Sequence, residues 1–115
     1  MAQHLFEARL RQVSGKAIID LQGEINAFAD ANLSEAFTQA EDTDCPDILL
    51  NFSDVSYINS TGIALIVGLL ARARKNNRRL LVCGLSDHFT EIFEITRLTD
   101  YMAIYPGEPE ALAAV

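Results

Sequence analysis

The feature of this sequence that most constrains its fold is a nearly continuous apolar run over residues 48–52, in which Asn51 is the single polar side chain. A strand that is apolar on both faces is typical of the centre of a parallel sheet covered on both sides. The run is followed by a polar junction and then by a second apolar stretch, 63–71, which is expected to be helical. Strand, junction and helix in this order indicate an α/β domain.

The rest of the chain has the periodicity expected of the remaining elements. Alternating apolar and polar residues over 6–11 predict a half-buried strand, and Ser14-Gly15 predicts the turn of a hairpin. The expected elements are strands over 6–11, 16–21, 48–52, 80–83 and 102–105, and helices over 29–40, over 60–76, from Ser86 or Asp87 onward and from Pro109 onward. Residues 1–115 are therefore predicted to form one β-β-α-β-α-β-α-β-α domain with a mixed, mostly parallel sheet.

Three local expectations accompany this assignment. The second strand is expected to end at Gly23, and residues 53–59 are expected to form a loop. The acidic segment 41–44 at the end of the first helix opposes the helix dipole, so fraying is expected there.

Composition excludes several classes of function. Half of the 115 residues are hydrophobic, which is enough for one domain with a core of its own. The formal charge of −7 argues against nucleic-acid binding, which requires clustered Lys and Arg. No apolar run approaches the roughly 20 residues that cross a bilayer, and no signal sequence is recognised, so a soluble cytoplasmic protein is expected.

Catalytic and metal-binding constellations are also not found. Cys45 and Cys83 are the two cysteines, and Cys83 stands in an apolar strand, which is typical of a buried thiol. His4 is terminal and His88 stands beside a helix start, so neither pairs by motif with Ser60 as a general base. The glycines are scattered and form no nucleotide-binding loop. The sequence predicts a protein that is not an enzyme and holds no metal or cofactor.

The candidate site is the junction Asn59-Ser60-Thr61-Gly62 between the central strand and the long helix. The start of a helix offers unpaired N–H groups and a partial positive charge, which favour phosphate. Two hydroxyls beside a glycine at such a place are candidates for phosphate chemistry. For Asn59 itself, the competing interpretation is an ordinary helix cap.

The helix after this junction is apolar nearly all round. The stripe expected to face the sheet consists of Ile63, Ile66, Val67 and Leu70. Leu65 and Leu69 lie off this stripe, so either a neighbouring helix covers them or they form a partner-binding face beside Ser60. Gly68 lowers helix propensity, and close approach by another backbone would explain it.

The sequence around the junction resembles the signature of the STAS domain, and more closely that of the single-domain bacterial anti-sigma factor antagonists. The matching segment is Asp54-Val55-Ser56-Tyr57-Ile58-Asn59-Ser60-Thr61-Gly62. Further matches are found at 23–26, 80–86 and 93–98, so the resemblance covers almost the whole chain in the right order. It implies a STAS-like fold.

The resemblance also implies a partner switch controlled by phosphorylation. In the family, the unphosphorylated antagonist binds a serine-kinase anti-sigma factor and frees a sigma factor, and a PP2C-type phosphatase restores this form. If the roles of the family's motif are transferred to this sequence, Ser60 is the phosphoacceptor and Thr61 a secondary site, and Gly62 keeps the helix start open. The alternative is a STAS module that binds partners without phosphorylation, as a scaffold or a transporter accessory subunit.

Two departures from the family pattern bear on this expectation. The family commonly has Asp where this chain has Asn26 and Asn59, so two negative charges are missing, and Arg97 stands where Gly is frequent. The residues expected to bind a partner are Asn26, Asn59, Ser60, Thr61, Gly62, Leu65 and Leu69. A weak homodimer stays open.

Overall fold

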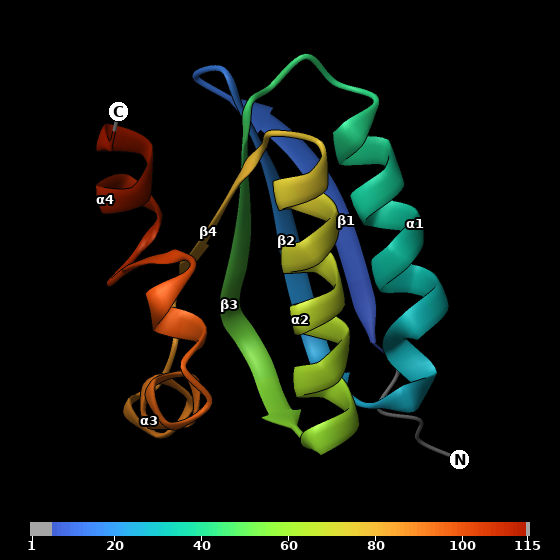
Figure 1. Ribbon diagram of the computed structural model, residues 1–115, viewed down its shortest axis with the longest axis vertical. Coiled ribbons are helices and arrows are strands. Elements are labelled where there is room, and N and C mark those ends of the chain that lie inside the picture. The colour runs from blue at the N-terminus through green and yellow to red at the C-terminus, as the bar shows by residue number, and fades with distance from the viewer. Residues whose placement is uncertain (1–5, 115) are drawn as a thin grey trace.

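The computed structural model describes residues 6–114 and contains a five-stranded sheet in the order β1-β2-β3-β4-β5 (Figure 1). The strands are β1 (Glu7–Val13), β2 (Lys16–Ile25), β3 (Asp47–Ile58), β4 (Arg79–Cys83) and β5 (Ala103–Tyr105). The helices are α1 (Asp30–Glu41), α2 (Ser60–Lys75), α3 (Asp87–Ile95) and α4 (Glu108–Ala113), with 3-10 turns η1 (Ala27–Ala29) and η2 (Leu98–Asp100). Only β1 and β2 pair antiparallel. The predicted α/β class and the predicted order of helices and strands are confirmed.

The apolar run of β3 contributes side chains to the cores on both faces of the sheet. Ile48 and Leu50 join the main core beneath α1 and α2, whereas Leu49 joins a second, smaller core that includes Ala111 of α4. This division follows from the geometry of a strand, whose successive side chains point to opposite faces. Figure 1 shows α1 and α2 side by side along one face. The central position predicted for this strand is confirmed.

Two strands extend further than the sequence predicted. β2 continues past Gly23 to Ile25, and residues 53–58, expected to form a loop, belong to β3. The pairing of β2 with β3 continues beyond two register shifts. Gly23 lies at the second of them with a φ of 101°, a conformation that favours glycine. The strands then end together at the pair Ile25 and Ile58. This extension places the candidate junction directly beside the end of β2.

The C-terminus of α1 is held by a cation from a distant part of the chain. Helix α1 is regular to Glu41, so the expected fraying is not observed. The guanidinium of Arg78 donates hydrogen bonds to the carbonyls of Cys45 at 2.7 Å and Thr43 at 3.1 Å, and also to those of Ala40 and Glu41. A cation at this end offsets the acidic residues and satisfies carbonyls that the helix leaves unpaired.

We expect Arg78→Met to lower the free energy of unfolding by about 2 kcal/mol, because it removes charge-assisted hydrogen bonds to several carbonyls. Urea denaturation followed by circular dichroism measures the change. Lys75→Met is the matched control, since Lys75 is exposed and its substitution should stay within about 0.5 kcal/mol of wild type. Equal effects of the two substitutions would contradict the proposed role of Arg78.

An ionic cluster lies where β2, β3 and β4 begin. The carboxylate of Asp47 is paired with Arg79 at 2.7 Å and with Lys16 at 3.4 Å. The hydrogen bonds from Arg79 lower the pKa of Asp47, and desolvation only partly opposes them. A carboxylate with a lowered pKa in the folded state stabilises the fold at pH values above its unfolded pKa of about 4.

Stability should therefore fall as the pH is lowered from about 5 through the unfolded pKa of Asp47 toward its folded pKa. The unfolded chain takes up the proton first, so acidification favours unfolding. In Asp47→Asn this contribution to the pH dependence should be missing, and the slope of unfolding free energy against pH below 5 should be shallower than in wild type. Urea titrations at pH 3 to 7 measure it, and parallel curves for the two proteins would refute the expectation.

Candidate functional site

The candidate site lies at the ends of β2 and β3, where α2 begins. Ser60 is the first residue of α2, and its side chain is exposed, as is that of Thr61. Gly62 is buried in the first turn. The N–H groups of Ser60 and Thr61 have no hydrogen-bond acceptor among residues 6–114. The hydroxyls are therefore displayed beside free donors at the positive end of a sixteen-residue helix.

Both asparagines of the site act as caps. The side-chain oxygen of Asn59 accepts a hydrogen bond from the Gly62 N–H at 2.9 Å, which confirms the cap interpretation of Asn59. The side-chain oxygen of Asn26 accepts from the Phe28 N–H at 3.0 Å and opens η1. Asp caps helices about as well as Asn. The two departures from the family pattern therefore leave the caps intact and remove only charge.

The two junctions of the site are joined by their backbones. The Asn59 N–H donates to the carbonyl oxygen of Ile25 at 3.3 Å. A Cβ atom added to Gly62 would lie 2.1 Å from the same carbonyl oxygen and 2.7 Å from Cγ1 of Ile58. Gly62 therefore lets the first turn of α2 press against the end of β2. This close packing explains why position 62 is a glycine.

The faces of α2 differ from the predicted assignment. Val67, expected to face the sheet, is 46% exposed, whereas Leu69 is only 4% exposed. The reason is that α1 lies alongside α2 and covers Leu69, so the buried face of α2 is turned toward α1. Of the two interpretations left open for Leu65 and Leu69, cover by a neighbouring helix is confirmed for Leu69, whereas Leu65 is partly exposed.

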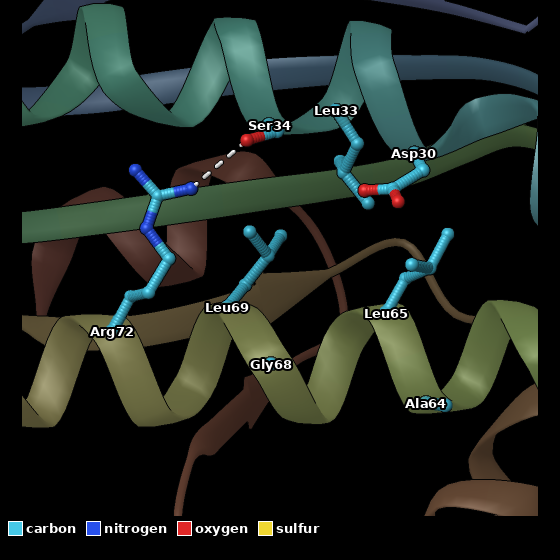
Figure 2. A pocket seen from close by; sticks show the side chains of 8 residues that line it. All are labelled: Asp30, Leu33, Ser34, Ala64, Leu65, Gly68, Leu69 and Arg72. Carbon is cyan, nitrogen blue, oxygen red and sulfur yellow. Dashed lines mark hydrogen bonds between the residues drawn. The ribbon is translucent and has the colours of Figure 1, made fainter.

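An open groove of about 230 Å³ runs between α1 and α2. Figure 2 shows Leu33 of α1 facing Leu65 and Leu69 of α2 across it. Asp30 lies at one end, near the start of α1, and Arg72 lies at the other. The buried Leu33 and Leu69 and the partly exposed Leu65 form the apolar base of the groove, and its two ends carry opposite charges.

The two ends of this groove, called here the α1–α2 groove, differ in their partners. Arg72 donates to Ser34 at 3.2 Å and pairs with Glu41 at 2.6 Å. Asp30 has no ion pair or side-chain hydrogen bond with any of residues 6–114. One end is therefore neutralised within the chain and the other is a free carboxylate.

One residue of this region was missed by the sequence reasoning. Phe28 in η1 is 92% exposed, more than any other large hydrophobic side chain of the described residues. The signal was present: the helical stripe that begins at Ala29 and continues through Leu33 leaves position 28 outside the buried face. Tyr57, just before the junction, is 51% exposed.

Other reactive groups lie away from the site. Burial raises the pKa of the Cys83 thiol to about 11, so it is a poor nucleophile. His88 is exposed at the start of α3, and His4 lies outside the described residues. Within residues 6–114, no group of His, Cys, Asp and Glu side chains could hold a metal ion. None of the helices in that range is long and apolar enough to cross a membrane.

Comparison with known proteins gives a consistent result. The model of the STAS domain family matches residues 7–111. An anti-sigma-B factor antagonist of Staphylococcus aureus is 35% identical over 89 residues, which cover 77% of this chain and 82% of the relative. The crystal structure of an anti-sigma factor antagonist from Mycobacterium paratuberculosis superposes with a TM-score of 0.85 at 19% identity, over 99% of this chain and 97% of that one. The Bacillus cell fate determinant SpoIIAA in its phosphorylated form gives a TM-score of 0.63 at 23% identity, over 91% and 96%.

We expect Gly62→Ala to lower the free energy of unfolding by about 3 kcal/mol, the upper range for overpacking, because its Cβ meets backbone atoms that cannot move aside. Gly68→Ala is the matched control in the same helix. Among residues 6–114, apart from its chain neighbours and the backbone of its own helix, no atom lies within 4 Å of a Cβ added there. This substitution should therefore stabilise the protein by up to about 1 kcal/mol. Urea denaturation measures both, and a tolerated Gly62→Ala would contradict the packing described here.

The Gly68 result also corrects an expectation. Close approach by another backbone was expected to explain this glycine, but among residues 6–114 nothing approaches the position of its Cβ. The packing of α2 within the chain therefore does not require it.

Proposed function

Because the chain belongs to the STAS domain family, we propose that it is an anti-sigma factor antagonist that binds a serine-kinase anti-sigma factor and so releases a sigma factor. The chain is a regulatory binding protein of this family and not an enzyme. The proposed partner surface surrounds the α2 start and comprises Asn26, Asn59, Ser60, Thr61 and Leu65, with the buried Gly62 holding the helix start against β2 beneath it. Leu69 supports this surface from below, since it is buried.

The observation that carries the proposal is the exposed Ser60 hydroxyl at the first residue of α2. A phosphate added there brings roughly −1.5 to −2 charges to a position beside free N–H groups. The fold accommodates that charge, so phosphorylation acts on the interface and leaves the domain folded. SpoIIAA, which shares the fold, is known in both unphosphorylated and phosphorylated forms.

Phosphorylation of Ser60 switches the protein off in this proposal. The phosphate places charge and bulk at the centre of the contact with the kinase. A loss of about 3 kcal/mol there weakens binding by roughly a hundredfold, since each 1.4 kcal/mol is tenfold. A PP2C-type phosphatase removes the phosphate and restores binding, and the cycle takes place in the cytoplasm. Thr61 is the secondary candidate because its hydroxyl is also exposed, and it becomes the main candidate if Ser60→Ala keeps the mass shift.

A second candidate is a STAS module that binds its partner without phosphorylation. It is favoured by the neutral caps Asn26 and Asn59, which carry no charge toward a kinase. Neighbouring genes discriminate between the two: a kinase and a phosphatase gene favour the switch, and transporter genes favour the alternative.

The proposal predicts that the purified protein, incubated with its cognate kinase and ATP, gains one phosphate by intact mass spectrometry. Ser60→Ala should abolish the mass shift, and Thr61→Ala should retain it. Ser60→Asp should weaken binding of the kinase roughly a hundredfold in isothermal titration calorimetry. A full mass shift in Ser60→Ala would assign the phosphate elsewhere, and equal binding by Ser60→Asp would favour the second candidate.

A further inference from the structure

We propose that Phe28 and the α1–α2 groove form the specificity surface for the anti-sigma factor: Phe28 enters an apolar pocket of the partner, and the groove receives a lysine or arginine side chain of the partner whose cation pairs with Asp30. This inference rests on the proposed function, because it names the chemistry of the same partner. It adds contacts outside the Ser60 position, which hold the partner before any phosphate is added.

Phe28 is built as a rigid projection. Its backbone N–H is bound by the Asn26 side chain at 3.0 Å, and the Ala29 N–H donates to the Asn26 carbonyl at 3.0 Å. The carbonyl oxygen of Ile25, the residue before Asn26, accepts a hydrogen bond from the Asn59 N–H beside Ser60. The side chain is large, apolar and 92% exposed, and because its turn is already fixed, binding costs little backbone freedom. Aromatic anchors of this kind dominate the energetics of protein interfaces.

The α1–α2 groove fits one kind of side chain. Leu65 and Gly68 form its accessible lining above the buried Leu33 and Leu69, which suits an aliphatic stem. Its free end carries the unpaired carboxylate of Asp30 (Figure 2). Lys and Arg lay an aliphatic stem along apolar surface while the charged group reaches a polar position. Arg72 closes the other end and is already paired with Glu41, so the cation must lie at the Asp30 end.

The position of Asp30 also compensates for the two missing carboxylates. Asn26 and Asn59 are neutral, and their side-chain oxygens are engaged in caps. Asp30 begins α1 immediately after η1, one helical turn beyond Asn26, and keeps a negative charge at the same surface. The chain carries a formal charge of −7, which further favours a basic partner surface.

The test is isothermal titration calorimetry of the unphosphorylated full chain against the purified cognate anti-sigma factor kinase. Phe28→Ala and Asp30→Asn should each raise the Kd at least tenfold, and Asp30→Glu should restore most of the affinity. The Kd of Asp30→Asn should depend less on salt than that of wild type, because an ion pair has been removed. Thermal unfolding of each variant should match wild type, since both side chains are exposed.

Matched controls come from α3. Ile95 is 74% exposed, and Asp87 is an exposed carboxylate in the first turn of its helix, as Asp30 is in α1. Ile95→Ala and Asp87→Asn should change the Kd less than twofold. If Phe28→Ala and Asp30→Asn bind like wild type while Ser60→Asp does not bind, this inference is wrong and the proposed function stands. If wild type itself fails to bind the kinase, the proposed function fails and this inference falls with it.

Discussion

The close backbone contact between the end of β2 and the start of α2 is the constraint on which the site depends. The Ile25 carbonyl accepts a hydrogen bond from Asn59 and lies against Gly62, so strand and helix cannot shift independently. Asn26, the cap of η1, follows Ile25 directly, and Ser60 follows Asn59 directly. One contact therefore fixes the turn that carries Phe28 and the helix start that carries Ser60 in a single rigid unit.

This rigidity affects how a phosphate on Ser60 would change the binding of a partner. The N–H groups at the start of α2 can take the charge of a phosphate, so the fold has no need to rearrange. In the proposed switch the surface changes only in charge, and the affinity of the partner depends on whether Ser60 carries a phosphate. In the same proposal the apolar surface at Phe28 and Leu65 is unchanged by the phosphate. Affinity then comes from the constant surface, and the switch comes from one position within it.

Much of the fold could be predicted from the sequence because local and long-range signals agree. The apolar run 48–52, the helical stripe of α1 and the turn at Ser14-Gly15 each match the observed elements. The strand ends were wrong at Gly23 and Ser53, because the pairing across a bulge is decided by tertiary contacts. For a similar reason Val67 is exposed and Leu69 is buried, contrary to the predicted buried stripe. Periodicity gives the faces of a helix, but the neighbouring elements decide which of those faces are covered. The site was found from the Ser60 junction, whereas Phe28 was missed although the helical stripe that begins at Ala29 already leaves position 28 outside the buried face.

The ionic cluster of Lys16, Asp47 and Arg79 lies where the parallel strands begin, and Ser60 lies where they end. This ionic cluster is thus separated by the length of the sheet from the helix start proposed to meet partners. Phe28, Asp30 and Thr61 are exposed and contribute little to the core. Such a chain can change its partner by drift at a few surface positions without losing its fold. Copies of it within one genome could in this way serve separate pathways without interfering with one another.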